Sequence, residues 1–104
     1  MAAGDRLARA STNYAGLVGR SYSALALRDA RSRWGSCSAT GTISLNWRLV
    51  HFGPAVIDYV VAHELAHLRE MNHSEAFWAV VRSVVPDVEA ARGALRTEVL
   101  PVLE

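Results

Sequence analysis

The pattern of apolar and polar positions along the 104-residue chain predicts helices interspersed with short strands. Apolar residues recur at helical spacing over residues 5–18, and Gly19 follows as a stop. Residues 22–28 are expected to form a short strand with imperfect alternation. Residues 42–49 alternate polar and apolar side chains, which is typical of a half-buried strand. Between the two strands, residues 29–40 are rich in Ser, Arg and Gly and are expected to form an ordered loop.

The second half of the chain is expected to be helical. A helix is predicted over residues 54–71, with one buried apolar face and one face that is aimed at a site. Asn72 or Ser74 can cap a second helix, and Pro86 ends it. A last helix is expected over about residues 87–99. The length of the chain predicts a single domain, residues 1–104.

Composition and charge favour a cytoplasmic globular protein. No apolar stretch reaches the roughly 18 residues that a membrane span needs, so no membrane association is expected. The single cysteine, Cys37, excludes an internal disulfide and fits a reducing compartment. The net charge of +1 is too small to indicate a nucleic-acid-binding protein. Arg28, Arg31 and Arg33 form a local cluster that we expect to be solvated, so nucleic-acid binding should be weak or absent. The sequence does not predict an oligomeric state.

The expected helix over residues 54–71 carries the motif His63-Glu64-Leu65-Ala66-His67. A helix repeats about every 3.6 residues, so His63 and His67 lie one turn apart and can bind one metal ion. Glu64 lies about 100° further round the helix, close enough to reach a water at that metal. An ionisable Glu beside an apolar helix face would be costly without such a partner. The motif therefore predicts a zinc hydrolase rather than a structural histidine pair.

A third protein ligand is required, and three residues are candidates. His73 comes six residues after His67, beyond the expected helix end, where the chain can turn back towards the metal. Glu70 is expected in the outer shell or in solvent, and Glu89 lies on a later helix, where other peptidase classes carry a ligand. We favour His73, which gives one zinc ion per chain with a fourth position open, as in catalytic sites.

Such a site predicts hydrolysis of peptide bonds. Zinc lowers the pKa of a water towards about 7 and polarises the substrate carbonyl. Glu64 is expected to act as the general base that takes the proton of this water and passes it to the leaving amine. Tyr59, Arg48 and His51 are candidates for stabilising the oxyanion, although a packed aromatic role is the simpler interpretation of Tyr59.

The strand over residues 42–49 bears on how a substrate is held. A strand with one free edge facing the metal could pair with an extended peptide, and we predict this arrangement over that of an interior strand. Trp34, Trp47 and Trp78 are expected in the core rather than in contact with substrate.

Four stretches follow one another in an order that is specific. They are RWGSCS at residues 33–38, GTISLNWRL at 41–49, IDYVVAHELAHL at 57–68, and Asn72-His73-Ser74 with Phe77-Trp78. Together they closely resemble the YgjP-like metallopeptidase domain, a zincin-like family similar to the SprT-like and WLM proteases. The match runs from about Asp29 to Pro86, and the chain resembles a short form that lacks the family's strand-rich N-terminal region.

The resemblance implies both a fold and a set of site residues. The implied fold is α+β and zincin-like, with an N-terminal helix, a small mixed β-sheet, an active-site helix and two C-terminal helices. By resemblance, His63, His67 and His73 are zinc ligands and Glu64 is the catalytic base.

Three functions fit a histidine-rich metal site of this kind. The leading interpretation is a zinc-dependent peptidase that acts on a peptide or protein substrate. A zinc-holding module that binds an extended peptide without cleaving it is the second, but such a module would not need Glu64 beside the metal. A DNA-associated repair protease, like the SprT-like relatives, is the third, and the net charge of +1 argues against a strong basic surface.

Overall fold

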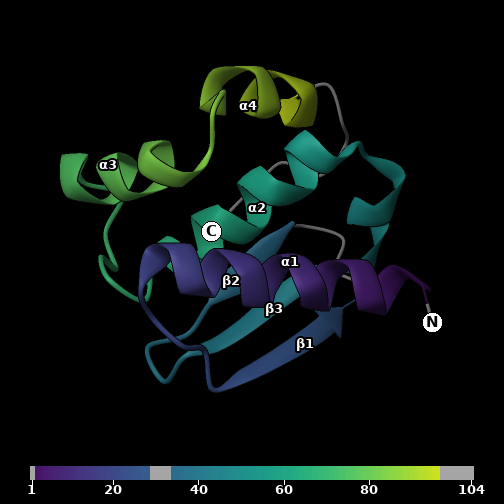
Figure 1. Cartoon of the computed structure of the whole chain (residues 1–104), viewed down its shortest axis with the longest axis horizontal. Helices are drawn as coiled ribbons and strands as arrows, with labels where there is room; N and C mark the ends of the chain where they lie inside the picture. Colours follow the sequence, from purple (N-terminus) through teal and green to yellow (C-terminus); the bar gives the residue numbers. More distant parts are fainter. Residues whose placement is uncertain (1, 29–33, 97–104) are drawn as a thin grey trace.

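The computed structural model describes residues 2–28 and 34–96, which form four α-helices and a three-stranded mixed sheet (Figure 1). In chain order the elements are α1 (Ala2–Val18), β1 (Ala24–Arg28), β2 (Gly35–Cys37), β3 (Thr42–Asn46), the 3-10 helix η1 (Trp47–His51), α2 (Pro54–Ala66), α3 (Glu75–Val84) and α4 (Val88–Arg96). The predicted α+β fold, with a helix first, then a small mixed sheet and then three α-helices, is confirmed.

The sheet has the strand order β1-β3-β2. β1 runs parallel to β3, whereas β2 runs antiparallel to it. The prediction that residues 42–49 offer a free edge is therefore wrong, because β3 is paired on both sides. Within the described residues, β1 and β2 are the edge strands. Ile43 and Leu45 of β3 are fully buried, which anchors the middle of the sheet in the core.

Two local expectations about the strands also need correction. The segment 29–40 contains β2, and its residues 29–33 lie outside the described part of the chain. The predicted strand over residues 42–49 ends at Asn46. The side-chain oxygen of Asn46 accepts a hydrogen bond from the backbone N–H of Arg48 at 3.0 Å, which caps the turn into η1. This side-chain cap competes with strand pairing and ends the alternating pattern early.

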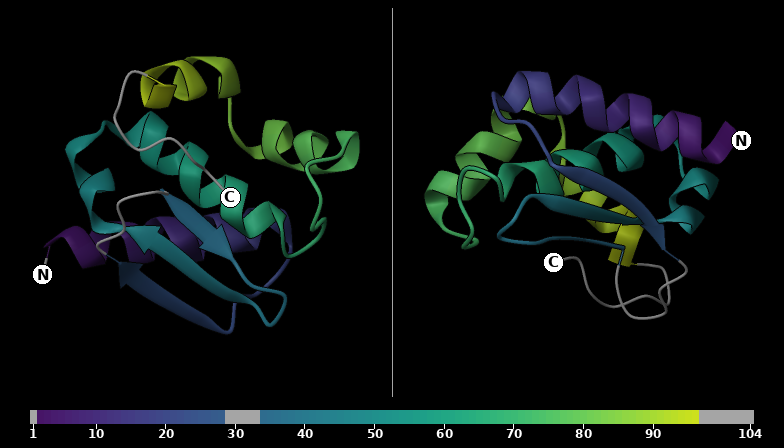
Figure 2. Two further views of the ribbon diagram at one scale, coloured as in Figure 1. Left: turned by 180° about the vertical axis from the view of Figure 1, so that it is seen from behind. Right: turned by 90° about the horizontal axis from the view of Figure 1, so that it is seen from below.

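Helix α2 lies at the centre of the molecule (Figures 1 and 2). α1 runs alongside it, the sheet lies on one side, and α3 and α4 lie on the other. These neighbours bury every residue of α2 from Val56 to Ala66 except Asp58, which is half-buried. The face expected to be aimed at a site is therefore buried as well as the apolar face. Its polar residues His63 and Glu64 are inside the core.

Two polar contacts join α1 to the α2 region. The hydroxyl of Tyr14 donates a hydrogen bond to the carboxylate of Asp58. Burial, and then the negative charge of Asp58 and this hydrogen bond, raise the pKa of Tyr14. The guanidinium of Arg69 donates to the backbone oxygen of Val18 at 3.4 Å, at the end of α1. The first contact lies in the first half of α2, and the second lies just beyond its end, near His67.

The helix boundaries differ modestly from those expected. α2 ends at Ala66 and is followed by turns over residues 67–69 rather than by helix to residue 71. Ser74, not Asn72, caps α3, since its hydroxyl accepts from the N–H of Phe77 at 3.3 Å. α4 spans Val88–Arg96, and residues 97–99 of the predicted last helix lie outside the described range.

The three tryptophans were all expected in the core. Trp34 is buried and Trp78 is half-buried, but Trp47 is 38% exposed, so the core assignment is wrong for Trp47. Its exposure follows from its place at the start of η1, after the strand has ended.

Among the helices of residues 2–28 and 34–96, not one has the length and apolar character that crossing a bilayer requires.

Candidate metal centre

Three histidines converge where α2 ends and α3 begins. The ligand atoms of His63, His67 and His73 all lie within 4.8 Å of one another. The ring centroids are 5.3 Å apart for His63 and His67, 5.1 Å for His63 and His73, and 4.7 Å for His67 and His73. His63 and His67 are buried, whereas His73 is exposed. Since they meet at one point, these side chains can hold a single metal ion.

The backbone after α2 fixes the orientation of one of these rings. The Nδ1–H of His67 donates a hydrogen bond to the backbone oxygen of Glu70 at 3.1 Å. This contact leaves Nε2 of His67 as the atom that can face a metal. Glu70 thus contacts His67 through its backbone carbonyl.

Two aromatic residues of α3 pack against the histidines. Phe77 is fully buried, and its ring centroid lies 4.9 Å from His63, 4.5 Å from His67 and 4.9 Å from His73. The ring centroid of Trp78 lies 5.7 Å from that of His63 and 6.1 Å from that of His73. His73 lies in the segment between α2 and α3, so these aromatic contacts hold its ring in place without support from a helix.

Glu64 is completely buried beside the histidines. Its Oε2 lies 3.3 Å from Nδ1 of His63, and its side chain is 0% exposed. Strand β2 covers it, since the backbone of Gly35 passes directly over the carboxylate. Burial, and then the charge of Glu64, raise the pKa of Cys37 to about 11. The Cys37 thiol therefore remains protonated at neutral pH, and the carboxylate is close enough to influence it.

The other candidate residues lie elsewhere or are packed. Glu89, the alternative third ligand, has a side chain that is 64% exposed and lies 3.2 Å from Arg82 on α3. Tyr59 is buried with its ring 5.8 Å from that of His63, as expected of a packed aromatic residue. Arg48 and His51 both lie against Trp47. The guanidinium carbon of Arg48 is 5.1 Å from the centroid of the Trp47 ring, and the ring centroids of His51 and Trp47 are 6.0 Å apart.

Within the described residues, the group able to hold a metal comprises the three histidines alone. Arg28, at the end of β1, is exposed, while Arg31 and Arg33 of the predicted basic cluster lie outside the described residues.

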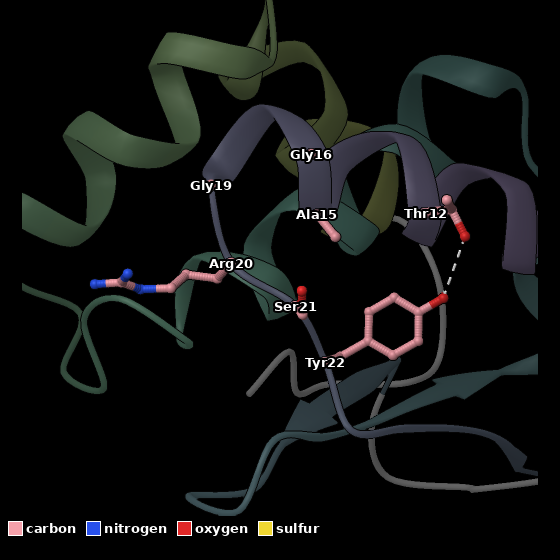
Figure 3. Close-up of a pocket in the computed structure, with 7 residues that line it drawn as sticks. All are labelled: Thr12, Ala15, Gly16, Gly19, Arg20, Ser21 and Tyr22. Atoms are coloured by element: carbon pink, nitrogen blue, oxygen red, sulfur yellow. Dashed lines mark hydrogen bonds between the residues drawn. The ribbon is translucent and has the colours of Figure 1, made fainter.

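A separate hollow of about 430 Å³ lies at the C-terminal end of α1 (Figure 3). The hydroxyl of Tyr22 lies 3.3 Å from that of Thr12 at its margin. The hollow contains no carboxylate, imidazole or thiol, so its lining offers none of the groups that the histidine site offers. Its lining residues are Thr12, Ala15, Gly16, Gly19, Arg20, Ser21 and Tyr22.

Residues 2–98 match the family model of the YgjP-like metallopeptidase domain, which is nearly the whole chain. The chain belongs to the YgjP-like metallopeptidase family. This membership makes it a metal-dependent hydrolase, as the sequence predicted. No curated protein matches the sequence.

The fold of this YgjP-like domain is similar to a solved structure, the metallopeptidase zymogen of Pyrococcus abyssi abylysin. The TM-score is 0.78 at 23% sequence identity, and the match covers 88% of this chain and 92% of that one. At this level of identity the likeness concerns the fold, and it confirms the predicted metallopeptidase architecture.

The histidines of the YgjP-like domain fit the metal that the family requires. Imidazole nitrogen suits zinc, copper, iron and nickel, whereas a site for magnesium or calcium would present oxygen ligands. A site with three protein ligands would leave one position open, as catalytic zinc sites do. The orientation of the His67 ring by a backbone carbonyl is the outer-shell support that such sites commonly have.

Sequence reasoning assigned no site role to residues 34–38. The structure places Gly35 and Cys37 of this segment beside Glu64. The available signal was the stretch Gly35-Ser36-Cys37, which precedes the histidine motif in the resemblance. Phe77 was noted within the stretches that carry the family resemblance, but its contact with all three imidazoles was missed.

Proposed function

We propose that residues 1–104 form one domain that hydrolyses peptide bonds with a zinc ion held by His63, His67 and His73. The observation that carries this proposal is the convergence of three imidazoles beside a buried carboxylate on the central helix. A structural histidine cluster would not need that carboxylate, because burying a charge is costly. When bound, zinc would supply acidification of a water and polarisation of the substrate carbonyl.

Glu64 is the proposed general base. Its carboxylate is shielded from bulk solvent and lies next to His63, which supports a role in taking a proton from a water at the histidine site. Glu64 would take a proton from the attacking water and deliver it to the leaving amine. His63 is placed by α2, His67 by the C-cap of α2, and His73 by its packing against Phe77 and Trp78.

Strand β2 replaces β3 as the proposed place for an extended substrate. The backbone oxygen of Trp34 accepts a hydrogen bond from the backbone N–H of Asn46 at 2.9 Å. The backbone N–H of Ser38 donates to the backbone oxygen of Thr42, also at 2.9 Å. Alternate residues of this segment therefore bond to β3. In an antiparallel ladder the intervening residues, Gly35 and Cys37, direct their backbone groups away from β3. A substrate backbone could pair with these groups next to Glu64.

This mode predicts an alternating response to substrate N-methylation. Methylating a peptide amide that pairs with β2 should raise KM by about 2- to 10-fold, the usual worth of one hydrogen bond. Methylating the next amide, which points away, should have a smaller effect. The measurement is KM for a series of singly N-methylated versions of one cleaved peptide. Equal effects at successive positions would contradict pairing with an edge strand.

Metal removal distinguishes a peptidase from a peptide-binding module. Metal analysis of the purified protein should find one zinc ion per chain. Incubation with a chelator should abolish cleavage of a peptide library, and added zinc should restore it, while magnesium should not. Binding of library peptides without cleavage in the zinc-loaded protein would favour the non-cleaving module instead.

A further inference from the structure

Gly35 lies so close to Glu64 that a side chain at position 35 would make unusually tight contacts. A Cβ atom at position 35 would be 3.0 Å from Cγ and 3.1 Å from Oε2 of Glu64. It would also be 3.2 Å from the backbone oxygen of Ser44. Favourable contacts between carbon atoms begin at about 3.5 Å, so an alanine here would force the Glu64 side chain to shift by a few tenths of an ångström.

The glycine is not required by the backbone conformation. Among the described residues, the glycines with positive φ are Gly19 and Gly41, not Gly35. Gly35 belongs to β2, where glycine costs about 0.5–1 kcal/mol relative to alanine. Local structure therefore favours a larger residue at this position, whereas a Cβ atom there would press on Glu64.

The neighbouring residues show that this face of β2 is turned towards α2. Gly35 and Cys37 are paired with Leu45 and Ile43 of β3, both of which are fully buried. Cross-strand partners project to the same face of a sheet, so Gly35 and Cys37 share the covered face. The influence of the Glu64 charge on the Cys37 thiol is consistent with this direction. Ser36 projects to the opposite face.

We propose that Gly35 is a positioning residue for the general base. The missing side chain at position 35 defines the space that the Glu64 carboxylate occupies, and thereby its alignment with the attacking water. β2 thus has two roles in the site, one through its outer edge and one through the face that covers Glu64. This proposal rests on the proposed role of Glu64 as a base.

The test compares Gly35→Ala with Ser36→Ala, a change on the same strand whose side chain faces away. Gly35→Ala should lower kcat by about 10-fold, less than the 10²-fold that a misplacement of about 1 Å can cause. Its KM and its zinc content should stay within about 2-fold of those of the native chain, because β2 still presents its edge and the histidines are untouched. Ser36→Ala should leave kcat unchanged.

A double-mutant cycle separates positioning from a general structural effect. In a Glu64→Gln background there is no base left to align, so Gly35→Ala should cause no further loss of kcat. An equal loss in both backgrounds, or an unchanged kcat in Gly35→Ala alone, would overturn the positioning role. An unchanged kcat in Glu64→Gln alone would instead overturn the proposed general base, so the two failures are distinguishable.

A second variant covers the case in which Gly35→Ala loses zinc or fails to fold. Gly35→Ala combined with Glu64→Ala removes the atoms that overlap. Recovery of the zinc content and Tm of the Glu64→Ala single variant would locate the conflict at Glu64, as proposed. Failure to recover would locate it at the Ser44 carbonyl and overturn the proposal.

Discussion

Replacing Glu64 with Gln is expected to lower the rate of peptide hydrolysis by about 10²–10⁴-fold, while one zinc ion per chain remains bound. Gln has nearly the same shape as Glu, so it should occupy the buried space between His63 and β2 without leaving a cavity. It cannot accept a proton from the attacking water at neutral pH. The loss should therefore appear in kcat rather than in KM or in metal content.

The matched control for this variant is Glu70→Gln. Glu70 supports His67 through its backbone oxygen, which the substitution retains, so hydrolysis and zinc content should both stay near those of the native chain. Initial rates on a peptide that the native chain cleaves, together with metal analysis of each variant, provide the measurement. Similar rates for Glu64→Gln and the native chain would exclude a general-base role for Glu64.

Replacing His73 with Ala is expected to weaken zinc binding by more than about 100-fold. Loss of an outer-shell partner typically costs 10- to 100-fold in metal affinity, and loss of a direct ligand should exceed this. His73 is exposed and lies outside the helices, so its truncation should cost little in packing, and the chain should remain folded. Competition with a chelator of known affinity measures the change, and circular dichroism checks the fold.

Glu89→Ala provides the comparison for this ligand assignment. The Glu89 carboxylate lies at the surface beside Arg82, away from the three imidazoles, so the variant should bind zinc as the native chain does. If Glu89→Ala released the metal while His73→Ala retained it, the third ligand would be Glu89 and the proposed site would be wrong.

Local periodicity was sufficient to predict the elements that are long or strongly patterned. α1 and α2 follow from their apolar spacing and from their stop and start residues, and β3 follows from its alternation. β2 could not be predicted in this way, because three residues of the type Gly-Ser-Cys carry neither alternation nor high strand propensity. Its strand conformation depends on pairing with β3 and on coverage by α2, which are tertiary effects.

The convergence of the three histidines was predictable because two of them are related by one turn of a single helix. The partners of these residues come from other parts of the chain. Phe77 contacts the imidazoles from α3, and Gly35 approaches Glu64 from a strand 29 positions earlier. Such contacts depend on how the layers are stacked, and a linear pattern does not specify this.

The central position of α2 has a consequence for the lifetime of the protein. The helix that carries His63 and ends at its cap His67 is also the helix around which the core is packed, so the site cannot form in a chain whose core has opened. A ligand that binds only the folded state stabilises it by about 2.7 kcal/mol when present at 100 times its Kd. Metal-starved chains would consequently unfold more often and be degraded sooner, so the amount of the protein would follow the supply of its ion.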